Sequence, residues 1–334
     1  MKAAVFHGPN DITIEEVDQP GLGEGDILLR VRACGICGSD LHTYKHGLFE
    51  DLGTPMGTGR VLGHEFTGEI AEIKGGTSGL KVGDRVCTVG VGGNAEYLRM
   101  PGLMAPMIFP IPEGISFEEA ATTEPLSTSL HAVNLAKPMN GETHVIMGAG
   151  IIGLGVLQVL KAKADVKVIM ADLSDRRLDL ARRLGADIIV NAGREDALRK
   201  VIDLFGAEYV SFMPAATGKV DTVFDCAGML MGFTGTPVLE QAVHMVKQNG
   251  KVVVVAIFEK LPIIDYNIVV RKGITIFGSW AWGLDEFKES LELIGSGKID
   301  RKPLITHSFP LDRAKEAYET QSKAQEAVKV MIVP

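Results

Sequence analysis

The run "THVIMGAGIIGLGVLQVL", residues 143–160, constrains the fold of this chain more than any other stretch. It begins as an apolar segment of strand type, turns through three glycines, and continues with the apolar spacing of a helix. A second apolar strand covers residues 166–172. A strand, a glycine-rich turn, a helix and another strand predict a unit in which helices connect parallel strands.

Strands and helices continue to alternate along the middle of the chain. We expect strands at 143–148, 166–172, 187–191, 221–226 and 251–257, and helices at 151–163, 174–185 and 238–250. Strands that are apolar throughout are typical of a parallel sheet covered on both faces. The sequence therefore predicts an α/β domain of the Rossmann type, with a doubly wound parallel sheet.

The three glycines have the spacing of a dinucleotide-binding turn. The first allows a tight turn, the second lets the backbone approach a pyrophosphate, and the third lets helix and strand pack closely. The helix that begins here offers free N–H groups and a partial positive charge to the phosphates. We therefore assign cofactor binding to Gly148, Gly150, Ile152 and Gly153.

An acidic residue, Asp172, ends the next strand, 24 residues after Gly148. Its carboxylate can accept both ribose hydroxyls of an adenosine and would repel a 2′-phosphate, which predicts NAD over NADP. Arg177 leaves the strictness of this choice open, because a nearby arginine could pair with such a phosphate. The alternative, a structural glycine turn beside a surface aspartate, is disfavoured because strand, turn, helix and acid occur together.

The chain outside this middle part has a different character. Up to about residue 110 it is β-rich, with expected strands at 26–33, 65–73, 84–89 and 95–100 punctuated by Gly, Pro and Asp, as in a barrel-like domain. A helix is expected over 116–136, interrupted at Pro125. The tail carries the expected helices 285–297 and 311–321 and a last strand, 327–333.

Length and charge limit the classes of protein to consider. With 334 residues, 46% of them hydrophobic, the chain can form about two domains. Its net charge of −8 argues against nucleic acid or an anionic membrane as the main partner. We find no secretory signal and no apolar stretch long enough for a spanning helix, and the four cysteines do not suggest a disulfide framework. A cytoplasmic protein is expected.

Several side chains of the first third have the chemistry of metal ligands. A thiolate, an imidazole and carboxylates suit zinc, and a catalytic zinc needs three protein ligands and one open position. The spacing alone does not show that these groups meet. They occur in "ACGICGSDLH", "GHEFTG" and "TTEPLS", which contain Cys37, Ser39, Asp40, His42, His64, Glu65 and Glu124.

The order of these motifs resembles that of the zinc-dependent medium-chain alcohol and polyol dehydrogenases, nearest to the sorbitol, butanediol and threonine dehydrogenase branch. The motifs are "GICGSDLH", "GHEFTGEI", "GLKVGDRV", "AEY", "EPLSTSLHAV", "GAGIIGLG" and "GKVVVV". The resemblance implies a GroES-like catalytic domain, residues 1–127 and 277–334, around an inserted Rossmann NAD-binding domain, residues 128–276. It also implies hydride transfer between a secondary alcohol, such as a polyol or diol, and NAD, which gives the ketone.

The resemblance further implies roles for single residues. Cys37 and His64 would be zinc ligands, and either Glu65 or Glu124 would be the third; this choice stays open. On the same grounds Ser39 would hydrogen-bond the substrate hydroxyl, His42 would pass its proton to solvent through the cofactor ribose, and Asp40 would orient His64. Backbone near Ala256, Gly278 and Ser279 would hold the nicotinamide.

One departure from the family changes the metal count. Most relatives carry a structural zinc in a lobe of four closely spaced cysteines after "GDRV", whereas here "GDRVCTVGVGGNAEY" runs almost directly into the next strand. We therefore predict one zinc per subunit, in a homodimer or homotetramer.

Other questions stay open at this point. The sequence does not identify the alcohol or its stereochemistry, and Trp280 and Trp282 could line a substrate pocket or be ordinary core aromatics. Two other functions are considered: a zinc-free reductase of quinones or enones from the same superfamily, and a non-catalytic NAD-binding protein.

Overall fold

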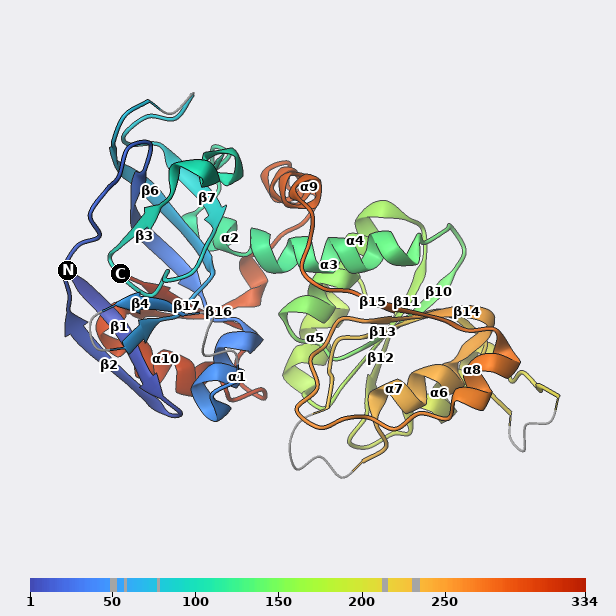
Figure 1. The fold of residues 1–334 in the computed structure, drawn as a ribbon. Helices are drawn as coiled ribbons and strands as arrows, with labels where there is room; N and C mark the ends of the chain where they lie inside the picture. The colour runs from blue at the N-terminus through green and yellow to red at the C-terminus, as the bar shows by residue number, and fades with distance from the viewer. Residues whose placement is uncertain (49–52, 57–58, 77–78, 212–215, 230–234) are drawn as a thin grey trace. The chain divides into compact units, whose positions relative to one another are not determined.

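The computed structural model describes residues 1–48, 53–56, 59–76, 79–211, 216–229 and 235–334. The chain divides into two compact units (Figure 1). Unit 1 comprises Met1–Pro125 and Phe287–Pro334, so both ends of the chain contribute to it, and unit 2 comprises Leu126–Glu286. The division into a catalytic and a cofactor-binding domain at 127/128 and 276/277 stays a prediction.

Unit 2 contains a six-stranded parallel sheet in the order β12-β11-β10-β13-β14-β15. The chain leaves β10 towards one edge of the sheet and later returns beside β10 to build the other half. This order confirms the predicted doubly wound fold. The strands are β10 (Thr143–Met147), β11 (Lys167–Asp172), β12 (Ile188–Asn191), β13 (Val220–Asp225), β14 (Val246–Val254) and β15 (Thr275–Gly278).

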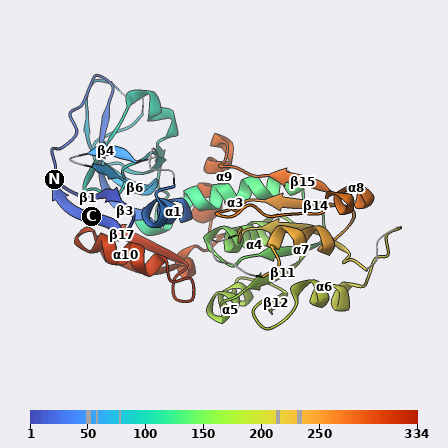
Figure 2. The same cartoon turned by 60° about the horizontal axis from the view of Figure 1, so that its bottom comes forward.

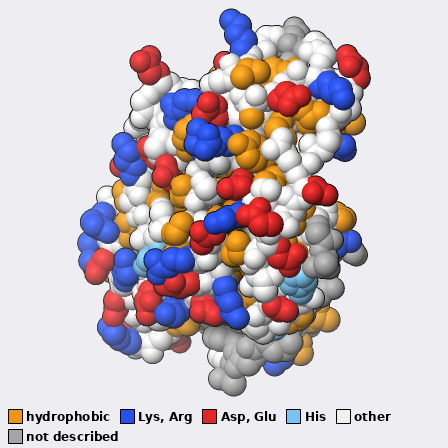
Figure 3. Space-filling model, turned by 90° about the vertical axis from the view of Figure 1, so that its left-hand side faces the viewer, with side chains coloured by type: hydrophobic (Ala, Val, Ile, Leu, Met, Phe, Trp, Pro, Cys, Tyr) orange, Lys and Arg blue, Asp and Glu red, His pale blue; other side chains and the backbone are white. Residues whose placement is uncertain are grey.

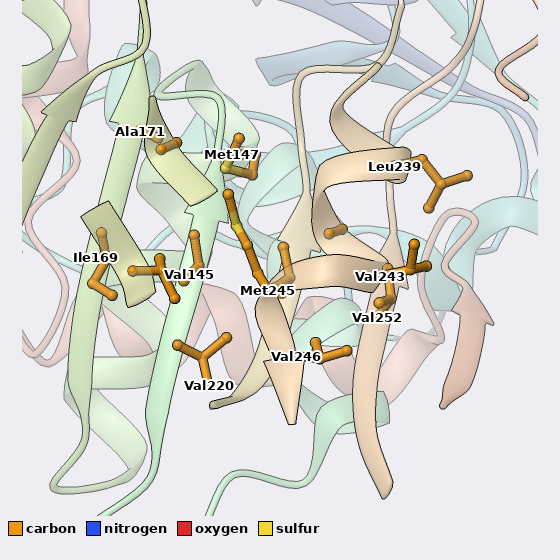
Figure 4. Close-up of a cluster of buried hydrophobic side chains, with 14 of the residues drawn as sticks. Val145, Met147, Ile169, Ala171, Val220, Leu239, Val243, Met245, Val246 and Val252 are labelled. Atoms are coloured by element: carbon orange, nitrogen blue, oxygen red, sulfur yellow. The ribbon is translucent and has the colours of Figure 1, made fainter. Parts of the chain in front are cut away.

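Helices cover both faces of this sheet, with α4 on one face and α6, α7 and α8 together on the other (Figure 1). A large apolar cluster lies between the sheet and the second group of helices and includes Val145, Ile169, Val243 and Val252 (Figure 4). The helices are α3 (Thr123–Ala136), α4 (Ile151–Lys163), α5 (Asp175–Arg183), α6 (Ala197–Phe205), α7 (Val238–Met245) and α8 (Tyr266–Lys272).

The expected helix 238–250 is wrong at its C-terminal end. Helix α7 ends at Met245, and Val246 is already extended and pairs with Val220 as the first residue of β14. A register shift in this pairing accommodates the exposed residues that follow. The buried Lys272 ammonium donates to the carbonyl groups of Val243 and Val246, so a cation from α8 satisfies the end of α7.

The expected helix 116–136 is interrupted at a different residue. The break falls at Thr122, between α2 (Phe117–Ala121) and α3, and not at Pro125. Pro125 lies in the first turn of α3, where a backbone N–H has no partner within the helix and its absence costs little.

Unit 1 is β-rich, as expected. One sheet has the strand order β2-β1-β5-β4, and the other has β16-β17-β3-β6-β7-β9, with β8 paired to β3. The strands are β1 (Lys2–Gly8), β2 (Asp11–Glu16), β3 (Ile27–Gly35), β4 (Thr54–Met56), β5 (Gly59–Val61), β6 (Glu65–Ile73), β7 (Arg85–Val89), β8 (Tyr97–Met100), β9 (Phe109–Pro110), β16 (Ile305–Pro310) and β17 (Lys329–Val333).

The tail of the chain is built into this unit, because β17 pairs with β3 in the second sheet. Helix α10 packs beside β17 (Figure 2) and also contacts β2. The helical segments of the unit are α1 (Gly38–His46), α2, η2 (Gly102–Met107), α9 (Leu284–Gly295), η3 (Lys302–Leu304), η4 (Leu311–Arg313) and α10 (Ala314–Gln321); α3 and α9 each begin in one unit and end in the other.

Two surface properties complete the description. Acidic and basic side chains are interspersed over the face drawn in Figure 3, as they are along the sequence. Within the described ranges, we find no helix with the length and apolar character that crossing a membrane requires.

Candidate metal centre and cofactor turn

Three potential metal ligands meet in unit 1. The Cys37 thiol sulfur, a ring nitrogen of His64 and a carboxylate oxygen of Glu65 all lie within 4.8 Å of one another. It is the one group of this kind found among the described residues. The pairing of β3 with β6, in which Gly35 faces Glu65, brings these segments together.

Cys37 is positioned by the start of α1. Its backbone is extended, with φ −81° and ψ 161°, and the helix begins at the next residue. The Cys37 N–H donates to Oδ2 of Asp40 at 2.9 Å, which fixes the first turn.

His64 is positioned between the same aspartate and Cys37. Its Nδ1 lies 3.5 Å from Oδ1 of Asp40, and its side chain is 24% exposed. Burial lowers the pKa of His64, but the negative charges of Asp40 and Cys37 outweigh this and hold the pKa well above its usual value. Because a metal binds neutral imidazole, metal binding here releases a proton.

Glu65 forms a buried ion pair that the sequence did not predict. Its Oε2 lies 2.5 Å from Nζ of Lys329, and neither side chain is exposed. Its other oxygen, Oε1, is buried and has no hydrogen-bond partner in the described part of the chain. Gly35 leaves room for this pair, because a Cβ at this position would collide with Oε2 of Glu65. One carboxylate therefore has an anchored oxygen and a second one available to a cation.

Two buried cations of this unit, Lys329 and Arg301, were not predicted from the sequence. Lys329 lies in "AVKVMIV", where a lysine interrupts an apolar strand, and that interruption was the available signal. Burial lowers the pKa of Lys329, but Glu65 and Cys37 outweigh it and raise the pKa, so the ammonium stays charged. A second fully buried cation, Arg301, donates Nε to Oγ1 of Thr122 at 3.2 Å.

The other predicted residues of the centre are placed less directly. Ser39 and His42 are half-buried and lie one turn apart on α1. Glu124 is half-buried in the first turn of α3, and it is not a member of the three-residue group. Of the two glutamates, Glu65 therefore belongs to the group with Cys37 and His64.

The three glycines of the turn in unit 2 differ in the space around them. Gly148 has φ +101°, and a Cβ there would lie 2.9 Å from the backbone nitrogen of Ala227. A Cβ at Gly153 would collide with the carbonyl oxygen of Gly148. At Gly150, by contrast, the nearest atom to such a Cβ is 4.0 Å away, so the backbone is open to an approaching group.

Asp172 closes the same turn at the end of β11. Its Oδ2 accepts from the N–H of Ala149 at 2.7 Å, and its Oδ1 accepts from the N–H of Ser174 at 2.8 Å. Burial lowers the pKa of Arg177, and the charge of Asp172 opposes this effect. The carboxylate and the guanidinium therefore lie near enough to interact beside Gly150.

The residues expected to hold the nicotinamide lie at the carboxyl ends of neighbouring strands. The Ala256 N–H donates to the Asp225 carbonyl at 3.1 Å, and the Ser279 N–H donates to the Val254 carbonyl at 2.8 Å. Ser279 Oγ is buried without a hydrogen-bond partner among the residues that are described, and Gly278, beside it, is exposed. Ligands of doubly wound sheets bind at this edge.

The tryptophans and the cysteines take more ordinary positions. Trp280 is 71% exposed, so it is not a core aromatic, and Trp282 is half-buried. All four cysteines are free thiols, and Cys34 is buried.

Two family models match the chain. One, described as an alcohol dehydrogenase GroES-like domain, matches residues 23–113. The other, described as a zinc-binding dehydrogenase, matches residues 152–296.

Individual relatives match over nearly the full length. The D-xylulose reductase of Saccharomyces cerevisiae is 31% identical, over 96% of this chain and 94% of the relative. The crystal structure of the 2R,3R-butanediol dehydrogenase of Bacillus subtilis superposes with a TM-score of 0.85 at 31% identity, covering 100% of this chain and 99% of that one. A zinc-binding dehydrogenase of Sinorhizobium meliloti, solved bound to NADP, gives a TM-score of 0.83 at 26% identity, covering 100% and 99%.

Proposed function

Because the chain belongs to the family of zinc-binding alcohol dehydrogenases with a GroES-like domain, we propose that it oxidises a secondary alcohol to the ketone with NAD and zinc. The relatives named for D-xylulose and 2R,3R-butanediol favour a polyol or a diol as the substrate. The metal centre belongs to unit 1 and the cofactor turn to unit 2.

The observation that carries this proposal is the group formed by Cys37, His64 and Glu65. Sulfur, nitrogen and oxygen donors within 4.8 Å of one another fit a zinc ion that keeps its fourth position for another ligand. The buried Oε1 of Glu65 is an acceptor for which the described residues offer no hydrogen bond, which supports Glu65 as the third ligand. Glu124 then binds near the metal without replacing Glu65.

Zinc, when bound, supplies a Lewis acid that lowers the pKa of a hydroxyl group. Ser39 accepts and passes on the hydroxyl proton of the substrate, and His42, one turn later on α1, carries it towards solvent. Asp40 orients the imidazole of His64 through the 3.5 Å contact between their side chains.

NAD, when bound, supplies the hydride acceptor. The open backbone at Gly150 and the N-terminus of α4 fit its pyrophosphate, and Asp172 fits the adenosine ribose. Ala256, Gly278 and Ser279 hold the nicotinamide. We propose NAD over NADP because the Asp172 carboxylate would repel a 2′-phosphate.

We further propose one zinc per chain. The connection between β7 and β8 spans only residues 90–96, and it contains no cysteine.

A homo-oligomer fits the free edge of unit 2. β15 is the last strand in the sheet order, and the following segment exposes Trp280. Leu261, Ile263 and Val270, which precede β15, are also largely exposed. A dimer or tetramer that covers this edge would bury these side chains. The cytoplasmic location stays a prediction from the sequence.

The test is a substrate panel on zinc-replete protein together with metal analysis. We expect about one zinc per chain and reduction of NAD with polyols, diols or 3-hydroxy amino acids, followed by the absorbance of the reduced cofactor. Turnover of quinones or enones by protein without metal would favour the zinc-free reductase. Binding of NAD without turnover of any compound would favour the non-catalytic alternative.

Variants of the ligands separate the two halves of the proposal. Cys37→Ser and His64→Ala should remove zinc and activity while NAD still binds. Cys87→Ser is the matched control, because this buried thiol lies outside the three-residue group. Wild-type turnover by either ligand variant would contradict the assignment of the site.

A further inference from the structure

The segment of residues 92–94 binds the backbone that precedes His64. The N–H groups of Gly92 and Gly93 both donate to the Gly63 carbonyl, at 3.0 and 2.9 Å. The next N–H, of Asn94, donates to the Leu62 carbonyl at 3.1 Å. Three consecutive N–H groups therefore bind the two carbonyl groups that precede His64.

The same segment restricts Gly63 from its side-chain direction. Gly63 has φ +94°, and a Cβ there would lie 2.6 Å from Sγ of Cys34 and 2.8 Å from Oδ1 of Asn94. Cys34 and Asn94 occupy the space that a side chain at position 63 would need, so Asn94 packs directly beside the peptide that precedes His64.

The Asn94 side chain is itself anchored to the C-terminal part of the chain. Its Nδ2 donates to Oη of Tyr318 at 2.8 Å. Asn94 is 1% exposed and Tyr318 is not exposed at all, and Oδ1 of Asn94 has no hydrogen-bond partner within the described ranges. Burying an acceptor without a hydrogen bond is unfavourable, so this link is not explained by stability alone.

Tyr318 connects this arrangement to the other half of the centre. Its ring packs against Tyr44 of α1, with centroids 5.2 Å apart and planes at 51°. Helix α1 begins beside Cys37 and carries Asp40, which contacts His64. The contacts therefore form a closed ring from His64 through Asn94, Tyr318 and α1 back to His64.

We propose that Asn94 and Tyr318 are positioning residues for the zinc centre. They hold the Gly63–His64 peptide and helix α1 at one spacing, so that the thiol of Cys37 and the imidazole of His64 are ready to bind one ion. This inference rests on the proposed zinc function. Neither residue belongs to the group of Cys37, His64 and Glu65, and neither has a role in the family resemblance described above.

The test compares two ring variants with a matched control. Tyr318→Phe removes only the hydroxyl, and Asn94→Ala removes the whole link. The control is Gln321→Met, also on α10, because Gln321 is 9% exposed and its side chain bonds Val328 and Val330 of the C-terminal segment. All three changes remove buried hydrogen bonds from unit 1. Only Tyr318→Phe and Asn94→Ala interrupt the closed ring of contacts.

Three measurements are made on each full-length protein: zinc affinity by competition with a chromophoric chelator, the visible absorption of the Co²⁺-loaded protein, and thermal unfolding of the metal-free protein. We expect Tyr318→Phe and Asn94→Ala to bind zinc about 10–100-fold more weakly and to change the Co²⁺ spectrum. Gln321→Met should unfold at a lower temperature but bind zinc and Co²⁺ as the wild type does.

Wild-type zinc affinity and an unchanged Co²⁺ spectrum in Tyr318→Phe would overturn the proposal, whatever the change in unfolding temperature. If Asn94→Ala does not fold, the conservative Tyr318→Phe decides the question. Failure of the proposed function is a distinct result, because the wild-type protein itself would then bind no zinc.

Discussion

Nζ of Lys329 lies 2.5 Å from Oε2 of Glu65, and both side chains are fully buried. The same ammonium donates to the Ile36 carbonyl at 2.8 Å, so it is held in place from two directions. Glu65 also belongs to the group that can bind a metal. One carboxylate therefore binds the permanent cation from β17, and we propose that it also binds the exchangeable metal ion of the centre.

Replacing Lys329 by Met should destabilise the metal-free protein by about 3–5 kcal/mol, because a buried carboxylate loses its partner. Added zinc should recover more stability in Lys329→Met than in the wild type, because the ion then replaces the positive charge that Lys329 no longer places beside Glu65. Thermal and urea unfolding with and without zinc measure both effects.

An ion pair between an exposed lysine and the buried carboxylate of Glu119 provides the control. Nζ of Lys302 lies 3.7 Å from Oε1 of Glu119, and the lysine side chain is 68% exposed. Lys302→Met should cost less than about 1 kcal/mol and leave the zinc effect unchanged. Equal stabilisation by zinc in Lys329→Met and in the wild type would show that the lysine does not compete for Glu65.

The choice of cofactor should respond to Asp172. Asp172→Ser should weaken NAD binding by about 10–100-fold, because a charged acceptor of hydrogen bonds contributes about 1.5–3 kcal/mol. NADP should bind more tightly to this variant than to the wild type, since the 2′-phosphate no longer meets a carboxylate and Arg177 remains nearby. Calorimetric titration with each cofactor measures both constants.

Arg177 is tested on the same background. Adding Arg177→Ala to Asp172→Ser should remove the gain in NADP affinity without restoring that for NAD. NADP affinity that stays at the wild-type level in Asp172→Ser would mean that Asp172 does not face the adenosine ribose.

His144 should make unit 2 sensitive to acid. It is fully buried in β10, and neither ring nitrogen has a hydrogen-bond partner in the described structure. Burial, assisted by Lys251 and opposed by Asp221, lowers its pKa from 6.5 to about 4. At pH values between 6.5 and about 4, His144 binds a proton in the unfolded chain but not in the folded chain. The free energy of unfolding therefore falls as the pH drops through this range.

The variant His144→Leu removes this contribution. We compare the free energy of unfolding of His144→Leu with that of the wild type. The difference should move in favour of the variant by about 2 kcal/mol when the pH is lowered from about 8 to about 5, because the wild type loses about 1.4 kcal/mol per unit of pH below 6.5. Urea unfolding at the two pH values measures the difference, with the exposed His46→Gln as the control. A gain that is the same at both pH values would exclude titration of His144 as the cause.

Unit 2 could be predicted from the sequence because its signals are local. The glycine turn, α4 and the end of β11 at Asp172 all lie within one short stretch, and each follows from periodicity and turn chemistry. The end of α7 could not be predicted in this way, because it depends on the ammonium of Lys272, which comes from the next helix.

The metal centre shows the same limit at longer range. The motifs around Cys37 and His64 identified the candidate ligands, but the partner of Glu65 is 264 residues away in the sequence. Gly35 is explained only by that partner, because the glycine leaves room for the carboxylate that Lys329 binds. No spacing rule connects these three residues; the pairing of β17 and β6 with β3 does.

Two glycines of the cofactor turn should respond differently to the same substitution. Gly153→Ala places a Cβ against the carbonyl oxygen of Gly148, so α4 must move away from β10, and we expect a loss of about 1–3 kcal/mol in unfolding free energy. Gly150 has φ −76° and open space in the Cβ direction, so Gly150→Ala should cost no more than about 1 kcal/mol as a helix N-cap change.

Binding of NAD should show the opposite order. The methyl group of Gly150→Ala fills the space that a pyrophosphate needs, so the dissociation constant should rise at least about tenfold in a protein that unfolds much as the wild type does. Gly153→Ala, measured at a temperature where it stays folded, should retain more of the wild-type affinity. Calorimetric titration gives the NAD dissociation constants of the two variants, and urea unfolding gives their free energies of unfolding. Unchanged NAD affinity in Gly150→Ala would mean that the pyrophosphate does not approach this backbone, and the assignment of the turn would then be wrong.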